Sequence, residues 1–307
     1  MSALPGPSSG PPLQGVVGFV LGGGGTLGDC EVGMLQALLE RGIVPDLVVG
    51  TSVGAINGAA IAADPTPEAV ERLRNVWLTL GEERVFSGAF GRAGNLIRKG
   101  THLHGNDALR RMVERLLPVR TFRELPVPFQ CVAASIERAA EHWFSEGSLV
   151  EAILASAAVP GLLPPVVIDG EHYVDGGIVN SIPVERAVEL GATELYIMQV
   201  GRIERPLQPP RNLLQVATVS FEIARRHRFA REMACLPPGI VTHVLPTGQE
   251  GAGPETVQIR YRSFSKAARR IAQAYDAANA YLDCAERTAV ERSGGSGRST
   301  ESRGSAQ

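Results

Sequence analysis

The chain has 307 residues, of which 44% are hydrophobic and 20% are charged, and its formal net charge is −2. This length supports one large core or two modest ones, and the near-balanced charge gives no electrostatic basis for a nucleic-acid partner. The four cysteines stand far apart without metal-ligand spacing, so we expect reduced thiols, no metal centre, no cofactor and a cytoplasmic location.

The two ends of the chain differ in composition from the middle. Residues 1–14 are rich in Pro, Gly and Ser and lack the basic start and apolar stretch of a secretory signal, so we expect a disordered leader. Residues 286–307 are predicted to form a disordered tail. The uncharged stretch 152–168 is interrupted by four Pro and Gly residues and does not resemble a membrane span.

Strand and helix patterns alternate between these ends. The predicted strands are 16–21, 47–49, 129–135, 194–200 and 241–245, with a hairpin at 166–174, and the predicted helices are 30–40, the segment after Ser52, 66–80, 106–117, 155–160, 183–190, 212–235 and 263–285. Such alternation predicts one α/β domain over 15–285 with a mainly parallel sheet. Residues 81–105 are glycine-rich and fit either a mobile cover or an irregular connection.

Ser52 carries the strongest chemical signal. It lies in Gly50-Thr51-Ser52-Val53-Gly54, directly after an apolar strand and before a run of small residues. A strand, a glycine-flanked serine and a helix form a nucleophile elbow, where a tight turn presents one hydroxyl beside a helix N-terminus. Gly50 and Gly54 are expected to support the turn, because a side chain at either position would meet the neighbouring strand or helix.

A second glycine-rich loop follows the first strand and has two interpretations. Gly23, Gly25 and Gly28 satisfy the dinucleotide fingerprint, but the next strand ends in Gly50-Thr51-Ser52 without the acidic residue that would hold a ribose. Alternatively, the backbone N–H groups of Gly22, Gly23, Gly24 and Gly25 form an oxyanion hole. Parallel strands place both loops at one edge of the sheet, which favours this interpretation.

The base that would activate Ser52 is less clear from the residues alone. None of the six histidines follows a motif that would direct it toward Ser52. Asp175 ends a predicted hairpin strand before Gly176 and Gly177, which would leave its carboxylate accessible. On the motif alone, a structural role is more common for such a turn than a catalytic one.

Four motifs together resemble the patatin-like phospholipases, from about residue 16 to residue 200. They are Gly22–Gly25 with Gly28, the elbow at 50–54, Ala155-Ser-Ala-Ala-Val-Pro160 and Asp175-Gly-Gly177. Beyond residue 200, the segments 212–235 and 241–247 are similar to bacterial members.

The resemblance implies a three-layer α/β/α fold and hydrolysis of lipid acyl esters by a Ser52–Asp175 dyad. It implies that Asp175 takes the serine proton directly, that Gly22–Gly25 bind the oxyanion, and that Gly176 and Gly177 support the base. The sequence departs from the family at Leu27, where a basic residue is usual. This departure bears on rate or substrate charge and not on the fold.

Two other functions remain open from the sequence. One is an α/β-hydrolase with a Ser52–Asp175–His243 triad, which is disfavoured because the elbow follows the second strand. The other is a non-catalytic lipid-binding scaffold with the same fold. The basic run at 224–231 fits either an ordinary solvated helix face or peripheral contact with an anionic membrane.

Overall fold

The computed structural model describes residues 15–82, 105–200, 203, 206–211, 213–248 and 266–295. The leader predicted at 1–14 lies outside these residues, as does 83–104, which is most of the predicted cover or connection.

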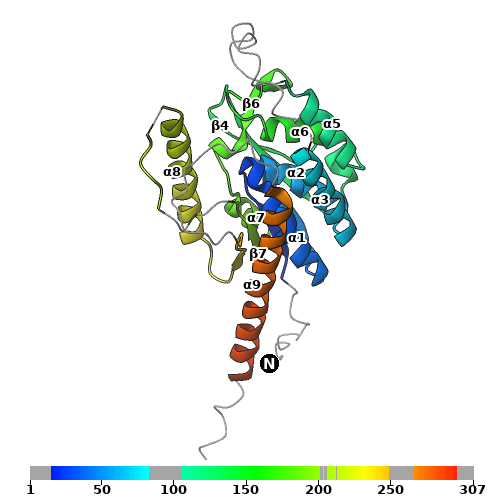
Figure 1. The fold of residues 1–307 in the computed structure, drawn as a ribbon, viewed down its shortest axis with the longest axis vertical. Helices are drawn as coiled ribbons and strands as arrows, with labels where there is room; N and C mark the ends of the chain where they lie inside the picture. The colour runs from blue at the N-terminus through cyan, green and yellow to red at the C-terminus, as the bar shows by residue number, and fades with distance from the viewer. Residues whose placement is uncertain are drawn as a thin grey trace, which may run out of the picture.

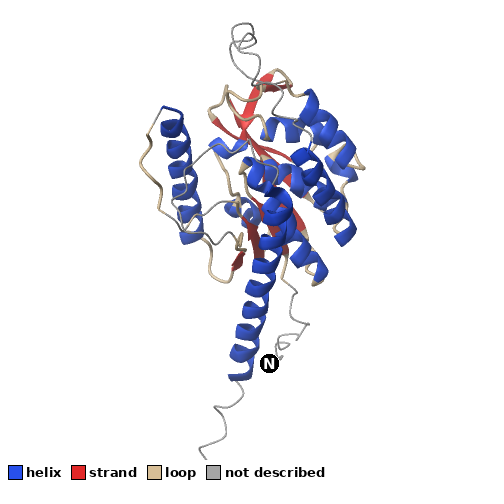
Figure 2. Cartoon of the chain, viewed as in Figure 1, coloured by secondary structure: helices blue, strands red, loops and turns tan. Residues whose placement is uncertain are grey.

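One mixed sheet with its strands mainly parallel forms the centre of the molecule (Figures 1 and 2). Its strands are β1 (Val17–Leu21), β2 (Leu47–Thr51), β3 (Phe129–Ser135), β4 (Ala140–Phe144), β5 (Val166–Ile168), β6 (Glu171–Asp175), β7 (Glu194–Met198) and β8 (Val241–Val244). The order is β5-β6-β3-β2-β1-β7-β8, with β4 paired to β3. The strands β3, β2, β1, β7 and β8 pair in parallel, whereas β4, β5 and β6 join by antiparallel pairs.

Helices cover both faces of this sheet. They are α1 (Asp29–Glu40), α2 (Val53–Ala63), α3 (Pro67–Glu82), α5 (Asp107–Leu116), α6 (Leu149–Ser156), α7 (Val184–Glu189), α8 (Leu213–Ala234) and α9 (Ala267–Gly295), with short 3₁₀ turns η1 (Gly25–Gly28), η2 (Phe122–Glu124) and η3 (Gly176–Ile178). The predicted three-layer α/β/α fold is confirmed.

Alternating side chains of β1 separate two cores. Phe19 and Leu21 belong to the larger core, which also contains residues of α1, α2, α3, α6 and α9. Val20 points to the smaller core with residues of β2, α7 and β7. Because successive strand residues face opposite sides, a continuous apolar run such as β1 is suited to a sheet covered on both faces.

The predicted catalytic residues lie together at the edge of the sheet where the parallel strands end. Leu21 at the end of β1 pairs with Gly50 of β2, and Gly50 pairs in turn with Cys131 of β3. The antiparallel β6 runs back beside β3, where Asp175 pairs with Ala133. The glycine loop, the elbow and the Asp175 turn therefore lie near one another in the fold.

The structure corrects the helix predicted at 155–160. Helix α6 begins earlier and ends at Ser156, with the Ser148 side chain accepting a hydrogen bond from the Glu151 amide at its N-terminus. The helix stops before Pro160 because a proline disfavours helical conformation in the residue before it and donates no backbone hydrogen bond. The short edge strand β4 was not predicted as a separate element.

The last helix is longer than predicted. Helix α9 runs to Gly295 and extends past the body of the molecule (Figure 1), whereas a disordered tail was expected from residue 286. Residues 286–292 are mostly Glu, Arg and Ala, which favour helix, so the helix continues beyond the packed region. The remaining residues, 296–307, lie outside the description.

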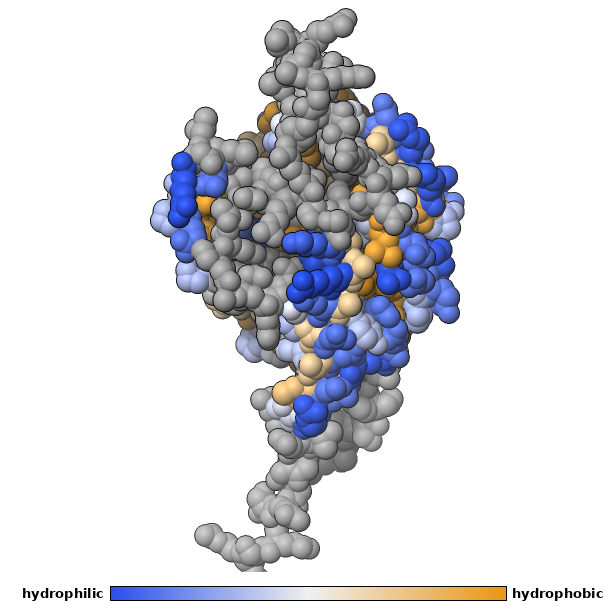
Figure 3. All heavy atoms as spheres, viewed as in Figure 1, coloured by the Kyte–Doolittle hydropathy of each residue, from blue (hydrophilic) through white to orange (hydrophobic). Residues whose placement is uncertain are grey.

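None of the described helices is both long and apolar enough to cross a bilayer. On the face of the molecule seen in Figure 3, hydrophilic residues predominate among the described atoms, with smaller hydrophobic areas between them.

Candidate active site

Ser52 occupies a strained turn between β2 and α2. Its backbone has φ 55° and ψ −119°, which a non-glycine residue rarely adopts. The turn is tight enough that a Cβ on Gly54 would lie 2.3 Å from the Leu21 carbonyl oxygen, and one on Gly50 would lie 2.4 Å from the Gly54 carbonyl oxygen. Both neighbouring atoms belong to the backbone, so only glycine fits at these two positions.

Asp175 lies directly against this turn. The Ser52 hydroxyl donates a 2.6 Å hydrogen bond to Asp175 Oδ2, and the Gly177 amide donates a 2.7 Å bond to Oδ1. At the next position, a Cβ on Gly176 would lie 2.1 Å from the Val132 carbonyl oxygen, so this residue must be glycine for the turn to pack on β3. The structure therefore brings together two residues that stand 123 positions apart in the sequence.

The surroundings of Asp175 favour its neutral form more than water would. Burial raises the pKa of this carboxyl to about 6, while the hydrogen bonds from Ser52 and Gly177 act in the opposite direction. The group is therefore ionised at neutral pH, yet it is a stronger base than an exposed aspartate.

The glycine loop after β1 offers fewer free amides than its sequence implies. The Gly22 amide donates to the Met198 carbonyl at 2.9 Å, and the Gly23 amide donates to the Ser181 carbonyl at 2.8 Å. Among the described residues, the amides of Gly24 and Gly25 have no acceptor. Gly25 has a φ of +59°, a left-handed conformation in which glycine avoids strain.

A buried polar group ties this loop to α2 and to the wall of a pocket. Asn57 Nδ2 donates to the Gly28 carbonyl at 2.9 Å and to Glu31 Oε2 at 2.7 Å, and its Oδ1 accepts from Trp77 Nε1 at 3.1 Å. Burial raises the pKa of the Glu31 carboxyl well above its usual value. These contacts hold the glycine loop, α2 and α3 in one arrangement.

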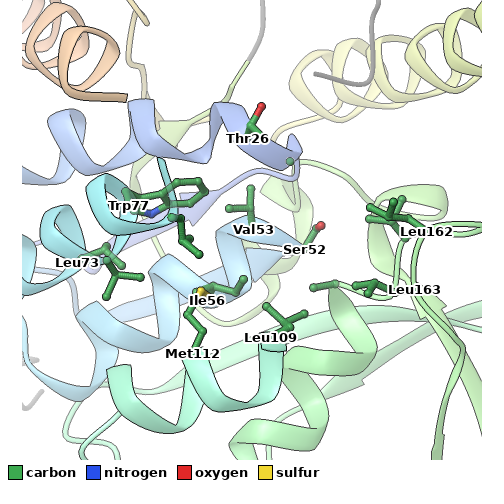
Figure 4. A pocket seen from close by; sticks show the side chains of 15 residues that line it. Thr26, Ser52, Val53, Ile56, Leu73, Trp77, Leu109, Met112, Leu162 and Leu163 are labelled. Atoms are coloured by element: carbon green, nitrogen blue, oxygen red, sulfur yellow. The ribbon is translucent and has the colours of Figure 1, made fainter. Parts of the chain in front are cut away.

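An apolar pocket opens beside Ser52 (Figure 4). Its lining residues come from the glycine loop, α2, α3, α5 and the segment after α6: Gly25, Thr26, Ser52, Val53, Ile56, Leu73, Val76, Trp77, Leu80, Leu109, Met112, Ala157, Val159, Leu162 and Leu163. Apart from Ser52 and Thr26, the side chains in this set are almost entirely hydrocarbon or aromatic. The pocket suits an acyl chain whose carbonyl would lie at Ser52.

The histidine considered for a triad lies elsewhere. His243 is on β8, three strands from β2, which corresponds to roughly 14 Å across the sheet. It stacks on Tyr196, with 4.7 Å between ring centroids, and its Nε2 lies 3.4 Å from Glu194 Oε1. The described residues that line the pocket include no histidine.

The basic run on α8 is largely neutralised by nearby carboxylates. Arg225 and Arg226 both pair with Glu222, and Arg228 pairs with Glu232 and, more distantly, with Glu141. Peripheral membrane contact through this run stays a prediction.

Ser156 is a contributor that the sequence interpretation missed. The sequence analysis assigned it no chemical role, but its Oγ accepts a 2.9 Å hydrogen bond from the Ser52 amide. Its position in the 155–160 motif was the available signal, although the motif does not reveal a bond across 104 residues.

The fold and the site place this chain in a class of α/β proteins. In this class, a buried serine is paired with a carboxylate and lies beside an apolar pocket. The model of the patatin-like phospholipase family matches residues 19–188, more than half of the chain, and the chain belongs to this family.

Among curated proteins, lysophospholipase nte1 of Aspergillus terreus is 30% identical over 192 residues, which is 61% of this chain and 12% of the relative. Patatin-like phospholipase domain-containing protein 6 of Mus musculus is 29% identical over 187 residues, or 60% of this chain and 13% of the relative. The chain thus spans about an eighth of the length of the curated relatives it matches. Among solved structures, VipD from Legionella pneumophila aligns with a TM-score of 0.46 and 16% identity, covering 88% of this chain and 67% of that one.

Proposed function

We propose that this protein is a serine acyl hydrolase that cleaves lipid acyl esters through a Ser52 acyl-enzyme. The observation that carries the proposal is the 2.6 Å hydrogen bond from Ser52 Oγ to Asp175 Oδ2 at the mouth of an apolar pocket. A serine hydroxyl is a weak nucleophile until a neighbouring base takes its proton, and here the neighbouring base is a carboxylate.

In the first half of the reaction, Asp175 accepts the Ser52 proton as Oγ attacks the ester carbonyl. The resulting tetrahedral oxyanion collapses by expelling the alcohol, which leaves with the proton held by Asp175. In the second half, Asp175 takes a proton from water, the hydroxide attacks the acyl-serine, and the fatty acid leaves as Ser52 regains its proton.

The oxyanion needs backbone donors aimed at its position. The Gly22 and Gly23 amides donate to backbone carbonyls, so the proposal assigns the oxyanion hole to Gly24 and Gly25. One such donor contributes about 2.7–4 kcal/mol to lowering the barrier. Leu27, which stands where relatives of this family usually carry a basic residue, packs against the larger core and supplies no positive charge to the oxyanion.

The pocket supports substrates with a hydrocarbon chain. The apolar lining would stabilise a bound acyl chain by van der Waals contact and by removing it from water. It contains few polar groups that could bind a polar substrate. Two curated relatives are named as a lysophospholipase and a patatin-like phospholipase domain-containing protein. We therefore assign lysophospholipids, phospholipids and neutral acyl esters as the substrate class.

A substrate panel with three variants tests the proposal. Hydrolysis of 4-nitrophenyl esters and lysophospholipids is measured for the wild type, Ser52→Ala, Asp175→Asn and Asp169→Asn. Asp169 is a matched control because it is an aspartate of the same hairpin, in the turn between β5 and β6, at a φ of 51° that asparagine also tolerates.

We expect Ser52→Ala and Asp175→Asn to lose at least about 10³-fold in kcat, by analogy with removal of a nucleophile or its base, and Asp169→Asn to retain activity. Hydrolysis that survives Ser52→Ala would contradict the proposal. If the protein were a non-catalytic scaffold, the wild type would not hydrolyse these esters. It would also not react with a fluorophosphonate probe.

A further inference from the structure

The end of helix α6 contacts the backbone of both members of the Ser52–Asp175 pair. Ser156 Oγ accepts a 2.9 Å hydrogen bond from the Ser52 amide, and two residues later the Ala158 carbonyl accepts a 2.9 Å bond from the Asp175 amide. We propose that the segment 156–158 sets the spacing of this pair and that Ser156 is a positioning residue for Ser52. This inference rests on the proposed function of the pair.

Ser52 requires an external acceptor for its amide. A positive φ is unfavourable for serine, so surrounding contacts must hold Ser52 in this conformation. Gly50 and Gly54 allow the turn by leaving space, but glycines do not hold a neighbour in place. The Ser156 hydroxyl supplies a direct bond to the strained residue itself.

Burial makes this bond hard to replace. Ser156 has no exposed surface, and Ser52 is 6% exposed. A buried amide that loses its acceptor favours any movement that restores a partner. Removal of the Ser156 hydroxyl therefore biases the turn away from the geometry that points Ser52 Oγ at Asp175.

The bond is not an ordinary helix cap. Helix α6 ends with the Ala157 amide bonded to the Ile153 and Ala155 carbonyls, so the helix satisfies these groups by itself. The Ser156 bond instead reaches a residue 104 positions earlier, at the start of α2. A tertiary contact of this kind serves the elbow and not the helix.

A displaced Ser52 has a measurable consequence at Asp175. The Ser52 hydrogen bond lowers the pKa of this carboxyl and opposes the effect of burial, and the Gly177 amide is its other hydrogen-bond donor. Among the described residues, no charged side chain contributes to this balance. Weakening the Ser52 bond therefore raises the pH at which Asp175 becomes ionised.

The experiment compares Ser156→Ala with Ser148→Ala in the chain of 307 residues. Ser148 lies at the opposite end of α6, where its Oγ accepts from the Glu151 amide at 3.4 Å, so the same substitution removes a hydroxyl of the same helix far from the elbow. For each variant, kcat, KM and the pH dependence of kcat/KM are measured with 4-nitrophenyl butyrate, together with the melting temperature.

We expect Ser156→Ala to reduce kcat by about tenfold or more, because small misplacements of reacting groups are costly, with KM changed by less than about threefold. In the pH profile of kcat/KM for Ser156→Ala, the acidic limb, where activity falls as pH decreases, should move to higher pH. Ser148→Ala should lower only the melting temperature. Ser156→Cys, which keeps a weaker acceptor of similar size, should fall between wild type and Ser156→Ala.

Wild-type kcat and an unmoved acidic limb in folded Ser156→Ala would overturn the inference, even if its melting temperature falls. If that variant does not fold, Ser156→Cys decides, and wild-type kcat with an unmoved limb overturns the inference in the same way. Hydrolysis that persists in Ser52→Ala marks a different failure, namely that of the proposed serine–aspartate pair.

Discussion

Burial and hydrogen bonding change the pKa of Asp175 in opposite directions, and their balance sets the pH range of the proposed reaction. Burial raises its pKa to about 6, and only the ionised form can take the Ser52 proton. We predict that kcat/KM is constant at neutral pH and falls tenfold per pH unit well below pH about 6. A rate profile between pH about 4.5 and 8 checks this, and a midpoint near pH 4 would show that burial does not control the base.

The same burial has a cost for stability. A carboxyl whose pKa is higher in the folded than in the unfolded state binds protons preferentially when folded. The folded state therefore loses stability as pH rises from about 4 through about 6, and the full cost is present above that range.

Asp175→Asn removes this cost, so we predict that the inactive variant is more stable than wild type at pH about 8, by roughly 2–3 kcal/mol. Urea unfolding at pH about 8 and at pH about 4 provides the measurement. The advantage should shrink at the lower pH, and an equal difference at both would contradict the assignment.

At the residue scale, the proposed catalytic side chains could be predicted from the sequence better than the hydrogen bonds of the backbone around them. Ser52 and Asp175 could be found because flanking glycines and strand ends mark positions where side chains are presented. The Ser156 bond and the occupied amides of Gly22 and Gly23 could not, because each depends on which carbonyl or hydroxyl approaches from a distant segment.

The elbow is an element whose geometry tolerates little change. We predict that Gly54→Ala destabilises the protein by more than about 2 kcal/mol, because its Cβ would lie 2.3 Å from the Leu21 carbonyl oxygen, a backbone atom. Gly105→Ala is a matched control, since the nearest described atom to its added Cβ, Asp107 Oδ2, is 3.8 Å away. Equal melting temperatures for the two variants would show that β1 and α2 can separate without cost.

Most elements could be predicted from the sequence, whereas their ends depend on packing and caps. Strands such as β1 are continuous apolar runs, and α3 begins at a Thr66-Pro67 pair that suits a helix start. Helix α6 was misplaced because the uncharged stretch from 152 hides its periodicity. The signal at Ser148 and Glu151, a capping pair, would have located its true beginning.

At the scale of the whole molecule, α9 closes the fold by packing along α1. Arg270 of α9 bonds to the carboxylate of Asp29, which begins α1 directly after the glycine loop. Asp29 is fully buried and Arg270 is 8% exposed. Burial raises the pKa of Asp29, and the guanidinium opposes that shift. Residues more than 240 positions apart thus hold the base of the loop.

We predict that Arg270→Leu costs about 3–5 kcal/mol, because it leaves a buried carboxylate without its cation. Arg269→Leu, the exposed neighbour, should change stability by less than about 0.5 kcal/mol. Guanidinium unfolding of the two variants gives the comparison. If the double variant Asp29→Leu with Arg270→Leu were no more stable than Arg270→Leu alone, the cost could not be assigned to the unpaired charge.

At the same scale, the order of the strands in the sheet could not be predicted from the sequence. The alternation of strands and helices predicts a mainly parallel sheet, but not that β1 lies between β2 and β7 or that β3 also pairs with β4 and β6. Those neighbours follow from which faces bury most apolar surface, a property of the assembled layers. The family resemblance supplied the three-layer arrangement that periodicity alone left open.

The direct test of the central claim is the rate at which a fluorophosphonate labels Ser52 at pH about 7.5 in wild type, Asp175→Asn and His243→Ala. The account predicts wild-type labelling in His243→Ala and labelling slowed by about 10³-fold in Asp175→Asn, because the carboxylate alone removes the serine proton. Labelling that survives Asp175→Asn and is lost in His243→Ala would contradict it.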